Sequence, residues 1–294
     1  MARRIKEPTE QGKAPLALGV HVSIAGGVDG AWTIARRLRC TAIQIFLKNN
    51  RQWSARPYRQ EEIAGFHSGR YCPVIAHACY LINLAAPQAV VRERSVCALI
   101  DEVQRAALLD VPVIVVHPGA HLGAGEREGL RTCAGSLDEV LGATRDRPVR
   151  LALEMTAGQG SALGYRVEHL EELYQRVRWP RRLAVCLDTC HLFAAGYDLR
   201  ETRRYDELVA ELERRVGIEQ VVAWHLNDSR GALGSRVDRH AHIGSGELGR
   251  AGFRLVVNDA RWAGVPMVLE TPKGPDLRAD RRNLSVIRRL WKRV

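Results

Sequence analysis

The hydrophobic positions of this chain fall into eight short apolar segments, each followed by a stretch with helical spacing. The apolar segments are rich in Val, Ile and Leu, as strands of a buried parallel sheet are. Apolar residues three and four positions apart predict the intervening helices. The expected strands are 17–24, 42–48, 74–80, 113–119, 150–155, 183–189, 221–228 and 267–272. The expected helices are 28–39, 59–68, 88–109, 127–144, 166–178, 200–215, 250–258 and 278–292.

This eightfold alternation of strand and helix predicts an α/β protein with a (β/α)8 TIM barrel, and a doubly wound open sheet is the alternative. The length of 294 residues suits a single barrel domain. No linker, composition shift or tandem repeat divides the chain. Residues 1–16 are polar and interrupted by Pro8 and Pro15, so we expect a flexible tail before a barrel catalytic domain over 17–294.

Histidine and carboxylate side chains recur at the carboxyl ends of these apolar segments. Buried charges are costly unless they are paired or bound to a metal ion. Because the carboxyl ends of barrel strands point at one central pocket, we expect these side chains to converge there. The nine candidate metal ligands are His77, His117, Glu154, Asp188, His191, His225, Asp238, His240 and Glu270.

Five histidines and four carboxylates exceed the roughly four ligands that one zinc ion takes, so they predict two or three ions. Imidazole and carboxylate ligands without thiolate fit Zn²⁺, with Mn²⁺ or Fe²⁺ possible. Ions about 3.5–4 Å apart can clamp the attacking and leaving oxygens of a phosphodiester, which is the chemistry we favour. Asp188 and His191 can face different ions of one cluster, and Asp238 and His240 share one side of an extended segment.

We expect other histidines and cysteines to have structural roles. His67 and His169 lie in polar helical contexts and are expected on the surface. His21, in the first strand, is interpreted as a packed residue or a hydrogen-bond partner of a ligand. Cys186 and Cys190 flank Asp188, but such cysteines are more often small buried apolar residues than ligands.

Charge adds a candidate partner. The chain has 44 basic and 33 acidic residues, a formal net charge of +11. A basic surface suits a polyanion such as nucleic acid, although the predominance of Arg is also explained by a general compositional bias. Seven cysteines without a CxxC pair fit a reducing compartment. Because no apolar run is long enough to cross a membrane and the N-terminus lacks the apolar region of a signal peptide, we expect a cytoplasmic protein. A monomer is the default expectation for an enzyme that wraps a duplex.

Nine motifs together resemble the endonuclease IV family of apurinic/apyrimidinic endonucleases. The resemblance extends from about residue 18 to residue 275, and its two most specific motifs are DTCHLFAAGYD at 188–198 and VDRHAHIGSGELG at 237–249. The other motifs are GVHVSIAGGV, KNNRQW, HACYLINLA, HPGAH, LEMTAGQG, HLNDS and LETPKG.

The resemblance implies a trinuclear zinc site, with Mn²⁺ as a possible substitute, that hydrolyses the phosphodiester 5′ to an abasic site in duplex DNA and leaves a 3′-hydroxyl. It implies catalytic roles for Glu154, which would bridge two ions, and for Glu270. It also implies that Arg51, Tyr80 and Leu81 contact the DNA at the lesion. The implied ligand groups are His77, His117 and Glu154; Glu154, Asp188, His225 and Glu270; and His191, Asp238 and His240.

Two other functions compete with this one. A metal-dependent sugar isomerase on the same barrel also has His, Asp and Glu at its strand ends, but it needs only two ions and leaves Asp238 and His240 without a role. A DNA-binding protein with structural zinc is a second rival, but structural sites are closed and usually rich in Cys. We therefore expect a zinc-dependent DNA repair endonuclease, with the sugar isomerase as the alternative.

Overall fold

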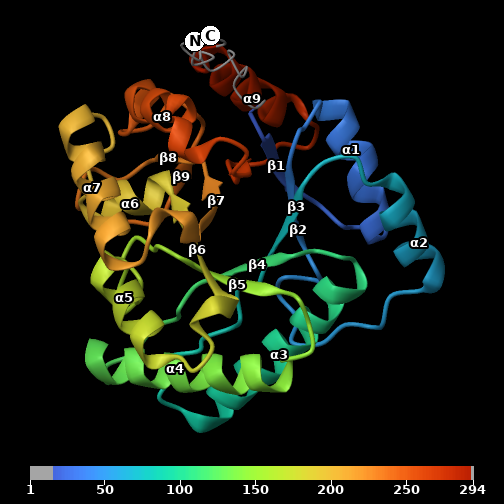
Figure 1. The fold of residues 1–294 in the computed structure, drawn as a ribbon. Helices are drawn as coiled ribbons and strands as arrows, with labels where there is room; N and C mark the ends of the chain where they lie inside the picture. Colours follow the sequence, from blue (N-terminus) through green and yellow to red (C-terminus); the bar gives the residue numbers. More distant parts are fainter. Residues whose placement is uncertain (1–15, 293–294) are drawn as a thin grey trace, which may run out of the picture.

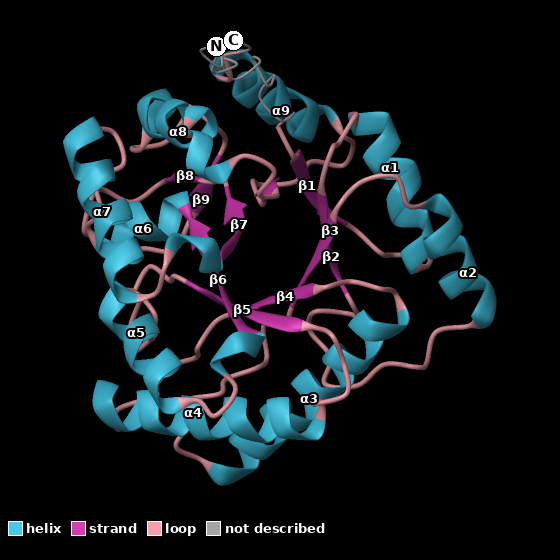
Figure 2. Cartoon of the chain, viewed as in Figure 1, coloured by secondary structure: helices cyan, strands magenta, loops and turns pink. Residues whose placement is uncertain are grey.

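Eight parallel strands close into a barrel in the computed structural model, which describes residues 16–292, and most helices lie outside the ring of strands (Figures 1 and 2). The order around the ring is β1-β10-β7-β6-β5-β4-β3-β2. The predicted TIM barrel is therefore confirmed. The barrel strands are β1 Leu18–Val22, β2 Ile43–Phe46, β3 Val74–His77, β4 Val113–Val116, β5 Arg150–Glu154, β6 Leu183–Asp188, β7 Val221–His225 and β10 Met267–Leu269.

The predicted helices are all present, with their ends shifted by a few residues. They are α1 Ala31–Leu38, α2 Gln60–Gly69, α3 Ala89–Leu108, α4 Glu126–Ala143, α5 Val167–Arg176, α7 Thr202–Arg215, α8 Gly249–Asn258 and α9 Arg278–Leu290. Short 3-10 helices are at Val28–Gly30, Pro180–Arg182, Ile218–Gln220 and Ala260–Trp262. The expected tail lies almost entirely in residues 1–15, outside the described residues. Among residues 16–292, no helix combines the length and apolar character of a membrane span.

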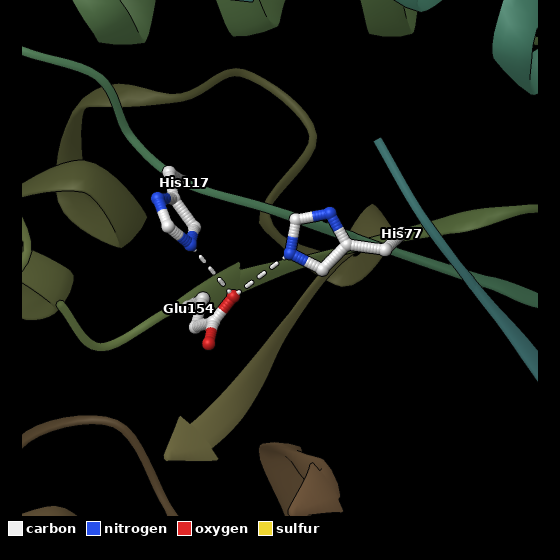
Figure 3. A group of neighbouring side chains, drawn as sticks. All are labelled: His77, His117 and Glu154. Atoms are coloured by element: carbon white, nitrogen blue, oxygen red, sulfur yellow. Dashed lines mark hydrogen bonds and ion pairs between the residues drawn. The ribbon is translucent and has the colours of Figure 1, made fainter. Parts of the chain in front are cut away.

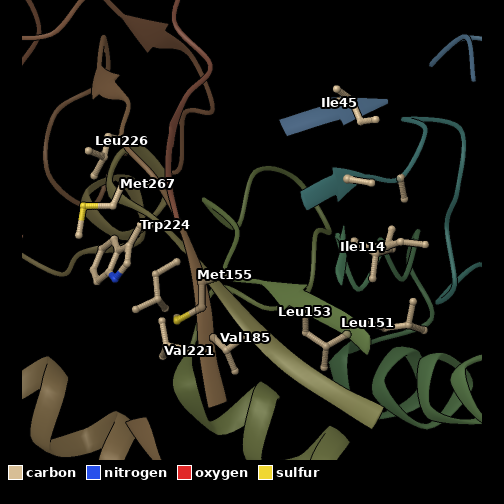
Figure 4. Close-up of a cluster of buried hydrophobic side chains, with 14 of the residues drawn as sticks. Ile45, Ile114, Leu151, Leu153, Met155, Val185, Val221, Trp224, Leu226 and Met267 are labelled. Atoms are coloured by element: carbon tan, nitrogen blue, oxygen red, sulfur yellow. The ribbon is translucent and has the colours of Figure 1, made fainter. Parts of the chain in front are cut away.

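Alternation along the strands separates two apolar layers. Ala152, Ala184 and Ala223 belong to a compact cluster of mostly small side chains from six strands, which we place inside the barrel. Their strand neighbours, such as Leu153, Val185 and Trp224, belong to the larger layer between strands and helices (Figure 4). Both faces of each strand are therefore buried, which explains the continuous apolar runs in the sequence.

Three features differ from or add to the sequence-based expectations. A short helix, α6 Thr189–Ala195, directly follows β6 because the Asp188 side chain accepts hydrogen bonds from the backbone N–H groups of Cys190 and His191. The segment between β7 and α8 contains a small antiparallel pair, β8 Asp228–Ser229 and β9 His240–Ala241. His169 is only 2% exposed, so its predicted surface position was wrong.

His169 is buried because its neighbours satisfy its polar ring. Its Nδ1 accepts a hydrogen bond from the Gly164 N–H at 3.1 Å, and Arg166 lies beside Nε2 at 3.0 Å. The helical spacing of its segment predicts α5 correctly, but it does not predict these hydrogen-bond partners. His67, the other expected surface histidine, is half-buried.

The close contact between β1 and the chain before β2 generates a stability prediction. A Cβ atom added to Gly19 would lie 1.6 Å from the backbone oxygen of Ala42, which cannot move without displacing β2. We expect Gly19→Ala to lower the free energy of unfolding in urea by about 3 kcal/mol or more, the upper range for overpacking.

The matched control is Gly135→Ala in α4, where a Cβ atom meets no described atom within 4 Å. Alanine favours helix over glycine, so this variant should be more stable by roughly 0.5–1 kcal/mol. Equal stabilities for the two variants would contradict the importance of the Gly19 contact.

Candidate metal centre

The candidate ligands converge because they continue the inward-facing positions of the barrel strands. Ala152 in β5 and Ala184 in β6 face the interior, and two and four residues later Glu154 and Asp188 face the same way. His77 and His225 are likewise the last residues of β3 and β7. Small side chains therefore fill the barrel below, and polar side chains gather at its carboxyl end.

The first group joins β3, β4 and β5. His77 Nε2 lies 3.1 Å and His117 Nε2 3.0 Å from the same carboxylate oxygen, Oε2 of Glu154 (Figure 3). Glu154 is completely buried, whereas 35% of the His117 side chain is exposed. This group is therefore open to solvent on the His117 side.

The second group uses the other oxygen of Glu154. His225 Nδ1 lies 2.8 Å from Glu154 Oε1, 3.4 Å from Glu270 Oε2 and 3.8 Å from Asp188 Oδ2. Oε2 of Glu154 thus faces the first group, and Oε1 faces the second. That arrangement suits a carboxylate shared between two ions.

The third group lies where α6 meets the segment between β7 and α8. Asp238 Oδ1 is 3.3 Å from His191 Nε2 and 3.6 Å from His240 Nε2. His240 Nε2 is also 3.9 Å from Asp188 Oδ2, so Asp188 lies between the second and third groups. The structure therefore brings all nine candidate ligands together in three adjoining groups.

Four of the five imidazoles donate one ring N–H to a neutral oxygen, which leaves the other nitrogen facing its group. Such partners select the tautomer and orient a ring for metal binding. The donor and acceptor pairs are His77 with the Ala78 carbonyl, 2.7 Å; His191 with the Met155 carbonyl, 3.0 Å; His225 with Gln44 Oε1, 2.8 Å; and His240 with the Glu270 carbonyl, 3.1 Å.

The electrostatics of these groups favour bound cations. Burial alone would raise the pKa of Glu154, but His225 and His117 outweigh it and hold the pKa well below its usual range. Burial alone would lower the pKa of His191, but Asp188 and Asp238 outweigh it and hold the pKa well above its usual range. The site therefore stabilises positive charge, which protons or metal ions can supply.

The donor atoms also have the spacing that zinc requires. Two ligands at the usual zinc distances and a tetrahedral angle are about 3.3 Å apart. The distances above lie close to this value, from 2.8 to 3.9 Å. His240 Nε2 is buried without a hydrogen-bond partner among residues 16–292, as expected of a nitrogen that binds metal. The residues therefore fit zinc.

Two cysteines lie near these groups, Cys186 beside Glu154 and His225, and Cys190 beside Asp188 and His240. Burial raises the pKa of each thiol to about 12, so both are protonated at neutral pH. A thiol binds metal as the thiolate. Both cysteines are buried, as expected, and we interpret them as packed residues rather than ligands.

Two buried amides that the sequence analysis missed hold the carboxylates in place. Gln44 Nε2 donates to Glu270 Oε1 at 2.6 Å and to His21 Nδ1 at 2.9 Å. Asn227 Nδ2 donates to Asp188 Oδ2 at 2.6 Å, and its Oδ1 accepts from the Glu270 backbone N–H at 2.8 Å. His21 contacts a ligand, as expected, and is in none of the candidate metal groups of the described chain. The signal available in the sequence was a polar amide side chain, Gln44 or Asn227, inside an otherwise apolar segment.

Asp228, also missed, organises the segment that carries Asp238 and His240. Its carboxylate is fully buried and accepts five backbone hydrogen bonds. A Cβ atom on Gly246 would lie 2.3 Å from the Ser229 carbonyl oxygen, so the motif requires glycine there. The five N–H donors belong to Ser229, Gly244, Gly246, Leu248 and Gly249.

The residues expected to contact DNA lie on two adjacent loops at the same end of the barrel. Arg51 is exposed in the loop after β2, and Tyr80 and Leu81 follow β3. Tyr80 is 63% exposed, and its backbone N–H donates to the Asn50 carbonyl at 3.2 Å. A cavity of about 520 Å³ extends between Tyr80, Asn50 and Glu270.

Comparisons with known proteins agree with this architecture. Residues 32–290 match the family described as "Xylose isomerase-like TIM barrel". The chain is 50% identical over 276 residues to "Probable endonuclease 4" of Chloroflexus aggregans, which covers 92% of this chain and 96% of the relative. It is 44% identical over 285 residues to the protein of the same name from Geobacter sulfurreducens, with 94% and 95% coverage.

Solved structures give the same result. Endonuclease IV from Thermus thermophilus superposes with a TM-score of 0.82 at 40% identity, over 93% of this chain and 98% of that one. A D-tagatose 3-epimerase-like protein, at a TM-score of 0.72 and 21% identity over 93% and 96%, shares the fold alone. With half of its residues identical to a relative over nearly the whole length, and the barrel in common, this chain belongs to the endonuclease IV family.

Proposed function

We propose that this protein is a zinc-dependent DNA repair endonuclease. It hydrolyses the phosphodiester on the 5′ side of abasic sites in duplex DNA and leaves a 3′-hydroxyl. The observation that carries this proposal is the convergence of nine His, Asp and Glu side chains around Glu154 into three adjoining groups. Relatives named endonuclease 4 over nearly the whole length of the chain support the same activity.

Each group would hold one zinc ion, about three per chain, with Mn²⁺ as a possible substitute. When bound, zinc acts as a Lewis acid on the scissile phosphate and stabilises the charge that develops on its oxygens. The three proposed ligand groups are His77, His117 and Glu154; Glu154, Asp188, His225 and Glu270; and His191, Asp238 and His240.

The protein's own contribution is to hold these ligands rigidly. Glu154 offers one oxygen to each of two groups, and so sets their separation. Oδ1 of Asp188 accepts hydrogen bonds from the backbone N–H groups of Cys190 and His191 at the start of α6, which directs Oδ2 toward the site. Glu270 is held by Gln44 and also lines the cavity, so we propose that it acts at the substrate side.

The loops above the site would bind the damaged duplex. The net charge of +11 favours a polyanion, and Arg51 is exposed close to the cavity. Tyr80 and Leu81 present an exposed aromatic ring and an adjacent aliphatic side chain, which suit insertion beside an unstacked step. The cavity next to Glu270 would receive the base-free sugar. We propose that the enzyme acts on duplex DNA as a monomer in the cytoplasm.

The sugar isomerase alternative explains less of the site. Two ions would leave the group of His191, Asp238 and His240 unused, together with the segment that Asp228 organises. A neutral sugar also has no need of a basic surface. The endonuclease therefore accounts for more of the observed structure.

The test of the function uses a labelled duplex with one abasic site, analysed on a denaturing gel. We expect a single cut 5′ to the lesion, no cut in the undamaged duplex, loss of cutting with a chelator and recovery when zinc is restored. Absence of cutting by the zinc-loaded protein, or zinc-dependent isomerisation of a free sugar, would contradict the proposal.

Metal content gives the first test of the proposed site. We expect elemental analysis to find about three zinc ions per chain, because the nine ligands form three groups. His191→Ala and Asp238→Ala should each lose one ion, and the double variant should be little less active than either single variant, since both residues serve one ion. One ion per chain with full activity would contradict the trinuclear site.

The second prediction concerns Glu154→Gln. The amide keeps the size of the side chain but removes the charge that holds two groups together, so turnover should fall by about 10²-fold or more. DNA binding and the circular dichroism spectrum should be preserved, because a rim residue contributes little to the core. Single-turnover cleavage measures the effect, and wild-type cleavage would exclude Glu154 from the mechanism.

The third prediction concerns Tyr80→Ala and Arg51→Ala. Neither residue is a proposed ligand, so zinc content should be unchanged while affinity for the abasic duplex falls relative to the undamaged duplex. Tyr71→Ala is the matched control, because Tyr71 is also exposed but precedes β3 at the opposite end of the barrel. An equal loss of affinity for both duplexes would show that Tyr80 and Arg51 contact only the DNA backbone.

A further inference from the structure

A second set of buried charges lies away from the proposed metal ligands. Lys48 follows β2 and Glu102 is in α3, and each side chain is only 1% exposed. Lys48 Nζ lies 3.4 Å from Glu102 Oε1 and 3.0 Å from Asp101 Oδ2. Apolar side chains would often stabilise a protein equally well at such positions. These charges therefore need an explanation that the metal site does not supply.

The Lys48 amine connects α3 with the loop that contains Arg51. It donates to the backbone carbonyl of Trp53, within that loop, at 3.1 Å and to the carbonyl of Ala98, in α3, at 3.2 Å. Together with the bond to Asp101, these contacts use all three N–H donors of the ammonium group.

A second cation, Arg105 in α3, binds the same loop further along the chain. Arg105 Nη2 donates to the Ala55 carbonyl at 2.8 Å, and its guanidinium lies 5.1 Å from the centre of the Tyr58 ring. Arg105 Nε donates to Asp101 at 2.9 Å. Because Asp101 and Arg105 are one helical turn apart, they present one polar face of α3 to the loop.

Glu102 holds the loop after β3, which contains Tyr80. Its Oε1 accepts a hydrogen bond at 3.2 Å from the backbone N–H of Cys79, the residue before Tyr80. Tyr80 in turn donates its backbone N–H to Asn50, the residue before Arg51. Glu102 Oε2 is buried without a partner in the described part of the chain, a cost that an apolar side chain would avoid. The ion pair thus connects both loops.

We infer that the Lys48–Glu102 pair positions the loops bearing Arg51 and Tyr80 and so determines selectivity for abasic over undamaged duplex, through hydrogen bonds to the loops rather than to metal. Lys48 also lines the cavity, but its side chain is only 1% exposed and its amine is bonded to Trp53, Ala98 and Asp101. Charged side chains suit this role because their hydrogen bonds to Trp53 and Cys79 have fixed directions, unlike apolar packing. Loops held in the bound arrangement lose less conformational freedom on binding. This inference rests on the proposed function.

The decisive variant is the double substitution Lys48→Met and Glu102→Gln. It removes both charges, whereas Lys48→Met alone leaves Glu102 buried without its partner and endangers folding. The control is Arg215→Met, which removes a cation bound to carboxylates of α5 and α7. Both variants are prepared with zinc, and their zinc content is measured.

Two readouts separate positioning from general stability. Steady-state cleavage of abasic duplex, with undamaged duplex as competitor, gives KM, kcat and the inhibition constant of the competitor. In the double variant we expect KM to rise about tenfold, the effect of losing hydrogen bonds from a charged donor. Zinc content, kcat and the inhibition constant should stay at wild-type values. Hydrogen exchange should accelerate in residues 47–58 and 78–82 and not in 228–249, and Arg215→Met should change none of these.

Three results would overturn the inference. Unchanged exchange in both loops, or an unchanged KM in the folded double variant, would show that the pair contributes only to stability. Loss of zinc together with selectivity would show that it supports the whole rim of the barrel. A wild-type enzyme that does not discriminate between the duplexes would instead overturn the proposed function, and hydrogen exchange would still report whether the pair holds the loops.

Discussion

The buried carboxylate of Glu154 is the group around which the rest of the site is arranged. Its two oxygens lie within 3.1 Å of His77, His117 and His225, which lie at or directly after the ends of three other strands. A buried negative charge is tolerated only if positive charge or hydrogen bonds surround it. His225 and His117 hold the pKa of Glu154 well below its usual range, and all three histidines come near because β3, β4 and β7 lie within two strands of β5 in the barrel.

The barrel separates stability from chemistry along its axis. Small side chains such as Ala152 and Ala184 fill the interior, while the larger apolar residues pack between strands and helices (Figure 4). The polar side chains sit only at the carboxyl end, where they do not disturb this core. A D-tagatose 3-epimerase-like protein with 21% identity shares the fold alone. Function is argued from the groups that strand ends and loops carry, because a fold by itself does not determine it.

Two kinds of buried charge serve two tasks at that end of the molecule. The first, centred on Glu154, gathers histidines and carboxylates into groups suited to cations. The second, Lys48 with Glu102, uses its charge to hold backbone groups of two loops. Both depend on hydrogen bonds that apolar packing cannot replace. The helix α3 therefore holds the proposed lesion-binding loops and supplies none of the proposed metal ligands.

The sequence by itself determined the barrel and the candidate ligands, because eight continuous apolar segments alternate with helical ones and polar residues follow at or just past the carboxyl ends of several of them. Only the tertiary structure decided which oxygen of Glu154 faces which histidine, and that Gln44, Asn227 and Asp228 hold the ligands. The burial of His169 and the short helix α6 after Asp188 were likewise visible only in the structure. These features depend on partners far apart in the chain or on backbone turns within loops. Hydrophobic periodicity predicts neither of them.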